Sequence, residues 1–100
     1  MTSPQRFAGR IAVITGGASG IGYALAKGAL LRGAKLVISD IRAEPLEAAR
    51  ASLAQHGEVL AVQGDVADYA AVEALAEAAV SAFGKVNLLF NNAGVFASGV

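Results

Sequence analysis

The sequence predicts an α/β fold, a doubly wound parallel sheet with helices on both faces. Four short runs along the 100 residues are apolar at nearly every position. Three segments whose apolar residues recur at helical spacing separate these runs. Continuous apolar runs are typical of parallel strands that helices cover on both sides. The pattern therefore indicates the element order βαβαβαβ.

The four expected strands are short and aliphatic. They span residues 11–14, 36–38, 59–62 and 86–90. Valine, isoleucine and leucine dominate them, and these residues pack well in a buried sheet.

Start and stop signals bound the first two helices. The first is expected from about Gly20 to Arg32, followed by Gly33, a residue type favoured just past a helix end. The second follows the Glu-Pro pair at 44–45, because proline is tolerated in the first turn of a helix. Its expected buried stripe consists of Leu46, Ala49 and Leu53.

The third helix has the clearest signals. Asp68 is a favourable N-cap and Gly84 follows as the expected C-cap. Five apolar residues between them recur at helical spacing and are expected to face the sheet. They are Val72, Leu75, Ala76, Ala79 and Phe83.

Right-handed crossovers arrange these strands in the order 3-2-1-4, the Rossmann-type order of dinucleotide-binding domains. No linker, repeat or low-complexity stretch divides the sequence, so residues 1–100 are expected to form the N-terminal part of a single domain. The fourth strand would lie at an open edge although it carries no protective charge. We therefore expect a further strand beside it and a domain that is incomplete at the C-terminus.

The composition excludes several classes of function. Eight basic and eight acidic side chains give a formal net charge of zero, and no basic stripe points to nucleic acid or an anionic membrane. Cysteine is absent, which excludes disulfides, thiolate metal sites and a cysteine nucleophile. The apolar run at 11–14 is far too short for a signal peptide or a membrane span. A cytoplasmic protein without a metal site is expected.

A glycine-rich segment, TGGASGIG at 15–22, joins the first expected strand to the first helix. Three glycines in such a segment allow a tight turn, close approach of a pyrophosphate and close packing of helix on strand. In chain order they are Gly16, Gly20 and Gly22. The N–H groups near Ser19 and Ile21 would face the phosphates at the positive end of the helix. Read alone, the segment could also be a flexible turn without a ligand.

Asp40 ends the second expected strand, where a dinucleotide site needs a carboxylate for the adenosine ribose. A carboxylate accepts hydrogen bonds from ribose hydroxyls and repels a 2′-phosphate, so Asp40 favours NAD over NADP. Arg42 could partly accommodate a 2′-phosphate, which leaves the strictness of this preference open. Read alone, Asp40 could be an ordinary turn aspartate.

Four motifs in this order resemble the short-chain dehydrogenases/reductases. They are the glycine-rich segment at 15–22, Asp40, Gly-Asp-Val at 64–66 and Asn-Asn-Ala-Gly at 91–94. The resemblance covers essentially residues 7–94, and the last motif is the most specific to the family. It implies an NAD(H)-dependent oxidoreductase that interconverts an alcohol and a ketone by hydride transfer.

The resemblance also implies roles for residues outside the glycine turn. Asp65 would bind the adenine amino group, Val66 would pack beside the ring, and Ile41 would belong to the same cofactor site. Thr15 would tie the first strand to the turn that lines the adenosine ribose and the central part of the cofactor. That turn consists of Asn91, Asn92, Ala93 and Gly94. Without the resemblance, Asp65 could be a loop residue and the two asparagines plain turn formers.

The family's catalytic residues, a Ser and a Tyr-x-x-x-Lys pair assisted by an Asn, lie downstream of the last motif, and no catalytic residue is expected in this chain. Tyr23 and Lys27 have the same spacing, but they lie in the first helix right after the phosphate turn, so we reject a catalytic role for them. His56 is expected to be solvated. Glu73 and Glu77 are expected on one solvated helix face rather than in a metal site.

The sequence thus predicts the cofactor-binding half of an NAD(H)-dependent enzyme, inactive by itself. Its substrate, a small alcohol or ketone, is not specified by these residues. The resemblance implies a homo-oligomer, a dimer or tetramer. Two alternatives stay open: a non-catalytic dinucleotide sensor and, less favoured because of the Asn-Asn-Ala-Gly motif, a methyltransferase in which Asp40 holds the ribose of the methyl donor.

Overall fold

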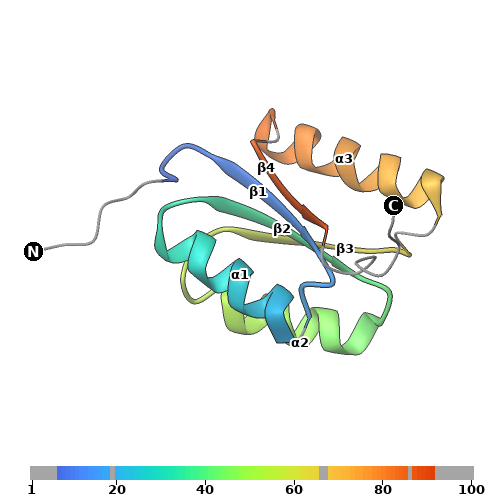
Figure 1. Ribbon diagram of the computed structural model, residues 1–100, viewed down its shortest axis with the longest axis horizontal. Helices are drawn as coiled ribbons and strands as arrows, with labels where there is room; N and C mark the ends of the chain where they lie inside the picture. The colour runs from blue at the N-terminus through green and yellow to red at the C-terminus, as the bar shows by residue number, and fades with distance from the viewer. Residues whose placement is uncertain (1–6, 19, 66–67, 86, 92–100) are drawn as a thin grey trace, which may run out of the picture.

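The computed structural model describes residues 7–18, 20–65, 68–85 and 87–91, with only the backbone described for the last four of these (Figure 1). Strands and helices alternate along these residues, which confirms the predicted order βαβαβαβ. The elements are β1 (Ile11–Thr15), α1 (Gly20–Leu31), β2 (Lys35–Asp40), α2 (Ala43–Leu53), β3 (Val59–Gln63), α3 (Tyr69–Phe83) and β4 (Leu88–Asn91).

The strands form one parallel sheet in the order β3-β2-β1-β4, as predicted. β2 is longer than its apolar run because its ladder continues as far as the pair Asp40 and Gln63. β4 begins later than predicted, because its pairing with β1 starts at Ala12 and Leu88. Apolar runs report burial, whereas backbone hydrogen bonds set the ends of a strand.

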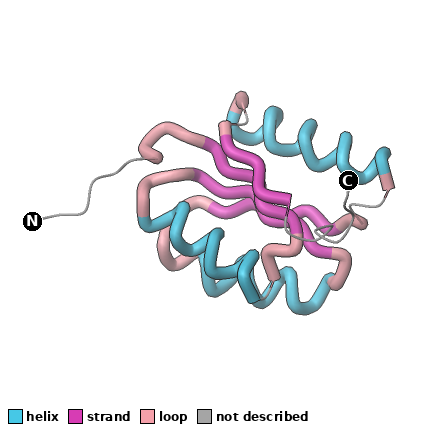
Figure 2. Tube along the Cα trace, in the orientation of Figure 1, coloured by secondary structure: helices cyan, strands magenta, loops and turns pink. Residues whose placement is uncertain are grey.

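Helices α1 and α2 cover one face of the sheet and α3 covers the other (Figures 1 and 2). Successive residues of β1 point to opposite faces, so Ala12 and Ile14 pack under α1 and α2 while Val13 packs under α3. β1 is buried along its whole length, and β2 is buried except at Lys35. β3 is only half-buried, contrary to the expectation of a strand covered on both faces, because it lies at the edge of the described sheet.

The helix ends agree with the predicted signals. α1 ends at Leu31, one residue earlier than predicted, and Gly33 follows in the left-handed region. The Asp68 side chain accepts a hydrogen bond from the backbone N–H of Ala70, 3.0 Å away, and caps α3. Gly84 is left-handed and donates to the carbonyl oxygen of Val80, which closes the same helix.

The buried face of α3 is narrower than predicted. Leu75 and Ala79 are buried and Phe83 is partly buried, but Val72 and Ala76 are exposed. α3 contacts the sheet through the row formed by Leu75, Ala79 and Phe83. Val72 and Ala76 lie beside this row and remain exposed to solvent. The predicted stripe of α2, in contrast, is fully buried.

Candidate functional site

The buried polar side chains of the described residues gather at the carboxyl ends of the strands, which we call the carboxyl edge of the sheet. Thr15 ends β1, and Ser39 and Asp40 end β2. Carboxyl ends of parallel strands form this edge, where open α/β sheets bind ligands at the point at which the strand order reverses. Here the order reverses at β1, whose neighbours are β2 and β4. The topology and the buried polar groups therefore identify the same place.

The turn that leaves β1 lies directly on β2. The Gly17 N–H donates to the Ser39 carbonyl oxygen at 3.0 Å. A Cβ on Gly17 would lie 3.0 Å from Cβ and Cγ2 of Ile38, so the contact admits no side chain without a shift. The turn is therefore held against the strand that ends in Asp40.

The outer side of the same turn is open. Gly16 and Gly20 both have positive φ, which favours glycine at each position. A Cβ built on Gly20 would meet nothing within 4 Å. α1 begins at Gly20, so the N–H groups of its first turn, which have no acceptor within the helix itself, lie beside this open backbone. The arrangement is suited to an anion such as a pyrophosphate.

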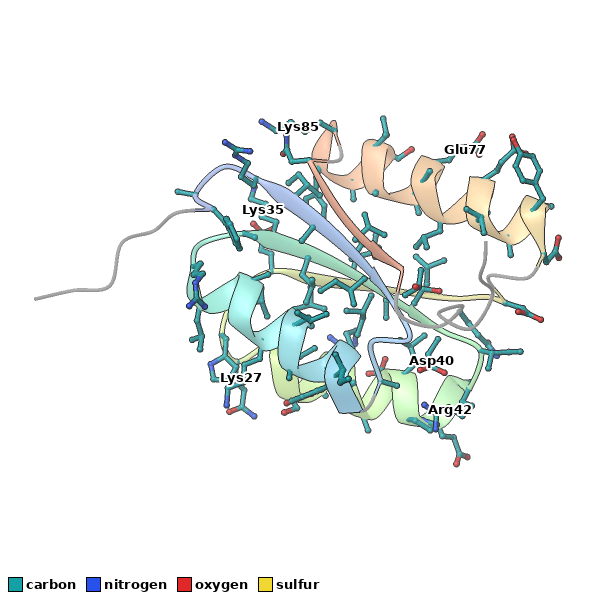
Figure 3. All side chains as sticks on the ribbon, in the orientation of Figure 1. Lys27, Lys35, Asp40, Arg42, Glu77 and Lys85 are labelled. Carbon is teal, nitrogen blue, oxygen red and sulfur yellow. The ribbon has the colours of Figure 1, made fainter. Side chains whose placement is uncertain are left out.

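Asp40 is held by two neighbouring segments. Its Oδ1 accepts from the Arg42 backbone N–H at 3.1 Å and from Arg42 Nε at 3.0 Å. Its Oδ2 accepts from Arg42 Nη2 at 3.1 Å and from the Ala18 N–H at 3.3 Å. The carboxylate thus joins the glycine turn to the N-cap residue of α2, and Figure 3 shows Asp40 and Arg42 side by side where β2 meets α2.

Opposing effects act on the pKa of Asp40. Burial by itself raises the pKa of the carboxyl group, because the charged form loses water. Hydrogen bonds and the positive charge of Arg42, together with the Ala18 N–H, outweigh burial and bring the pKa below the ordinary aspartate value. Asp40 is therefore an ionised carboxylate at neutral pH.

The other predicted cofactor residues that the structure describes lie at or near this edge. Ile21 and Ile41 are exposed apolar side chains next to the turn and next to Asp40, and Asp65 is exposed just after β3. Gly22 is buried inside the first turn of α1. The backbone of Asn91 pairs with Thr15, so β4 ends beside the glycine turn. Ser19, Val66, Asn92, Ala93 and Gly94 lie outside the described residues.

The residues rejected as catalytic have structural roles or face solvent. The Tyr23 hydroxyl lies 2.6 Å from Ser52 Oγ and joins α1 to α2, while Lys27 is exposed on α1 (Figure 3). His56 is exposed after α2, and Glu77 is exposed on α3. Among the described residues no group of His, Cys, Asp and Glu side chains could hold a metal ion.

Sequence reasoning missed two features of the site. It assigned roles to the glycines at 16, 20 and 22, but the tight contact with β2 belongs to Gly17. A pair of consecutive glycines directly after a buried strand was the available signal. The sequence also suggests Arg42 as a ligand for a 2′-phosphate, whereas in this structure its guanidinium donates two hydrogen bonds to the Asp40 carboxylate.

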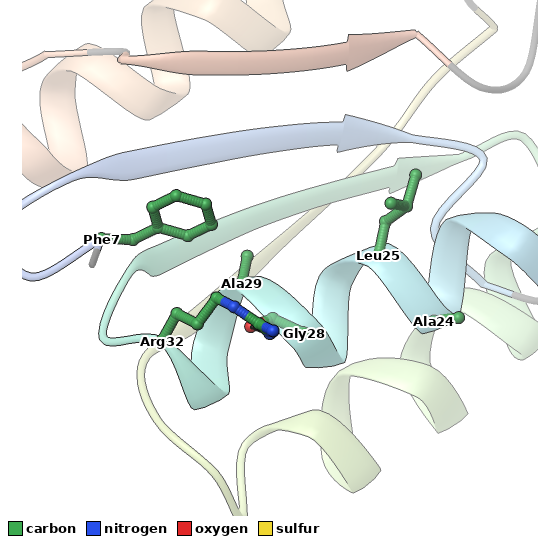
Figure 4. A pocket seen from close by; sticks show the side chains of 6 residues that line it. All are labelled: Phe7, Ala24, Leu25, Gly28, Ala29 and Arg32. Carbon is green, nitrogen blue, oxygen red and sulfur yellow. Dashed lines mark hydrogen bonds between the residues drawn. The ribbon is translucent and has the colours of Figure 1, made fainter. Parts of the chain in front are cut away.

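A shallow hollow of about 360 Å³ lies elsewhere, along α1 (Figure 4). Its lining is mostly apolar, and its one charged side chain, Arg32, donates to the Gly28 carbonyl oxygen at 3.2 Å. The hollow is lined by Phe7, Ala24, Leu25, Gly28, Ala29 and Arg32. It shares no residue with the edge that holds Asp40.

Within the described ranges no helix is long and apolar enough to cross a membrane.

Fold and site together define the chain as a Rossmann-type α/β domain. Residues 10–100 match the family model described as short chain dehydrogenase. Levodione reductase of Leifsonia aquatica is 44% identical over 93 residues, which cover 90% of this chain and 35% of that protein. The chain belongs to the short-chain dehydrogenase/reductase family of oxidoreductases, which confirms the predicted family.

Solved structures agree with this assignment. A short-chain dehydrogenase/reductase from Burkholderia phymatum in complex with NAD gives a TM-score of 0.81 at 46% identity, covering 84% of this chain and 30% of that one. L-sorbose reductase from Gluconobacter frateurii, complexed with NADPH and L-sorbose, gives 0.86 at 35% identity, covering 97% and 40%. The chain spans about a third of the length of the curated relatives it matches.

Proposed function

We propose that this chain supplies the NAD(H)-binding part of an oxidoreductase that interconverts an alcohol and a ketone. The observation that carries the proposal is the buried, ionised carboxylate of Asp40, held beside the open glycine turn at the carboxyl edge of the sheet. Family membership supports oxidoreductase chemistry, and similarity to a levodione reductase supports a carbonyl or hydroxyl substrate.

The described residues suit a dinucleotide. The open backbone at Gly20 and the first-turn N–H groups of α1 would hold the pyrophosphate, and Asp40 would accept hydrogen bonds from the adenosine ribose. Ile41 and Asp65, with Val66, would surround the adenine. The remaining predicted contacts come from Gly16, Ser19, Ile21, Gly22, Asn91, Asn92, Ala93 and Gly94. A bound nicotinamide supplies the hydride acceptor or donor.

Asp40 favours NAD over NADP in this proposal. The carboxylate is negative and nearly enclosed, so a 2′-phosphate placed against it would be repelled. Solved relatives include one complex with NAD and one with NADPH, so the preference is a property to measure in this protein itself.

The rest of the proposal concerns the full-length protein that carries this chain. We place residues 1–100 in a single domain and the catalytic Ser, Tyr and Lys downstream of Gly94. The protein would be a cytoplasmic homo-oligomer, and the 100-residue chain alone would be inactive. Hydride transfer by the full-length protein but not by this chain would support the division of roles.

Titration of the full-length protein with NADH and then NADPH, followed by nicotinamide fluorescence, tests the cofactor site. We expect tighter binding of NADH, and we expect Asp40→Ala to weaken it about 10- to 100-fold, since hydrogen bonds to a charged group contribute roughly 1.5–3 kcal/mol. Glu77→Ala on the exposed face of α3 is the matched control, because it removes a carboxylate far from the site. Failure of both dinucleotides to bind would contradict the proposal.

A further inference from the structure

Asp40 has little capacity left for a ligand in this structure. A carboxylate offers about two acceptor positions on each oxygen. Arg42 N–H and Nε occupy those of Oδ1, and Arg42 Nη2 and the Ala18 N–H occupy those of Oδ2. The Asp40 side chain is 6% exposed, whereas the Arg42 side chain that pairs with it is 52% exposed. A ribose that bound Asp40 would therefore have to replace some of these contacts.

The four contacts differ in how easily they can be broken. Two come from backbone N–H groups, in the glycine turn and at the N-cap of α2, and these are fixed by the fold. The other two come from the long Arg42 side chain, which is half-exposed and can rotate away. Its departure would free one acceptor position on Oδ1 and one on Oδ2. A vicinal ribose diol has two hydroxyl donors and needs that pair of positions.

We infer that Arg42 is a specificity-determining residue that competes internally with the adenosine ribose of NAD(H) for Asp40. The inference rests on the proposed cofactor site. The guanidinium keeps the buried carboxylate paired in the free protein and is displaced when the 2′- and 3′-hydroxyls bind. Binding of NADH therefore includes the cost of opening this ion pair. When the ligand carries a 2′-phosphate, the displaced guanidinium pairs with the phosphate, so Arg42 weakens the preference for NAD.

Another arginine–carboxylate pair among the described residues provides a matched comparison. Arg50 Nη2 lies 2.6 Å from Glu47 Oε2, but the Glu47 side chain is largely exposed on the surface of α2 and does not belong to the proposed cofactor site. Both arginines belong to the α2 region, and each pairs with a nearby carboxylate. Arg42→Ala and Arg50→Ala thus remove the same charge, but only the first removes a competitor at the site.

The test measures dissociation constants of NADH and NADPH for the full-length protein and the variants Arg42→Ala, Arg42→Lys and Arg50→Ala by nicotinamide fluorescence. We expect Arg42→Ala to tighten NADH about two- to fivefold, the usual range for opening a partly exposed ion pair. The same variant should weaken NADPH about tenfold, because a charge-assisted hydrogen bond to the phosphate is lost. Arg42→Lys keeps the charge without the two-pronged contact and should lie between.

Competition by 5′-AMP and by 2′,3′-dideoxy-5′-AMP identifies the hydroxyls as the competing group. Arg42→Ala should improve 5′-AMP and leave the dideoxy nucleotide unchanged. If Asp40→Ala weakens NADH binding but Arg42→Ala binds NADH no more tightly than Arg50→Ala does, the inference is overturned. If the unaltered protein binds neither NADH nor NADPH, the proposed function is overturned instead. A cooperative melting transition in each variant verifies that it is folded.

Discussion

Polar side chains lie at both the carboxyl edge and the amino edge of the sheet, but they are buried at the carboxyl edge and exposed at the amino edge. At the carboxyl edge Thr15, Ser39 and Asp40 are buried. At the amino edge Lys35 and Glu58 form a 3.3 Å ion pair with side chains 49% and 67% exposed. Figure 3 shows Lys35 at one end of the sheet and Asp40 at the other.

The difference shows where the fold holds polar groups in fixed positions. Burying a polar group is costly unless it is hydrogen-bonded, and no buried side-chain nitrogen or oxygen in the described part of the chain lacks a partner. The carboxyl edge meets this requirement by fixing the glycine turn, β2 and the start of α2 to one another. The amino edge leaves its charges in water, where an ion pair contributes little.

The largest effect expected from this contrast is at the glycines of the two edges. Gly17→Ala should lower the free energy of unfolding by about 1–2 kcal/mol, because the new Cβ meets the Cβ of Ile38 in the middle of the sheet. Gly57→Ala at the amino edge meets only the terminal methyl Cδ2 of Leu30, which can rotate, so its effect should stay within about 0.5 kcal/mol. Chemical denaturation measures both, and equal effects would remove the contrast.

A smaller effect is expected from acid. The folded pKa of Asp40 lies below its unfolded value, so its contribution to stability is complete above the unfolded pKa of about 3.9 and is lost as the pH falls through the folded pKa. Asp40→Asn has no carboxylate to titrate. Denaturation from pH 5 downwards should therefore bring the stabilities of the two proteins together. A constant difference over that range would show that Asp40 is not the titrating group.

The smallest effect is expected at the amino edge. Glu58→Gln should change the free energy of unfolding by less than about 0.5 kcal/mol, because both partners of its ion pair are well exposed. Lys35→Ala should cost more, since the Lys35 ammonium also lies 5.7 Å from the centroid of the Phe83 ring. Thermal melts in low and high salt measure both changes. A strongly salt-dependent loss in Glu58→Gln would mean that the edges are more alike than their exposure indicates.

The sequence predicted the element order and the strand order, because apolar period and right-handed crossovers depend on local composition and chain topology. It also placed Asp40 at the end of β2. The contact of Gly17 with Ile38 was not predictable from spacing, since it depends on how closely the turn approaches a strand that is distant in sequence. The exposure of Val72 and Ala76 was missed for a similar reason: helical spacing gives a face but not the width of its contact.

Arg42 illustrates the remaining gap between sequence and structure. Its position two residues after Asp40 allowed two outcomes, a ligand for an added phosphate or a partner for the carboxylate. The choice depends on the rotamer of a long side chain at the N-cap of α2, which no pattern of neighbouring residues determines.

Asn87, at the amino edge, also influences the geometry of the carboxyl edge. Its N–H donates to the Ile11 carbonyl oxygen and its side-chain oxygen accepts from the Ile11 N–H, each at 2.9 Å, so the residue adds one more rung before the β1–β4 ladder. This rung fixes the alignment of the two strands at one end, and the backbone carries that alignment to Thr15 and Asn91 at the other. A slip of one residue would move β4 by about 3.3 Å and reverse the faces of its side chains. One asparagine at the far end of the sheet thus helps to determine where β4 ends beside Thr15 at the candidate site.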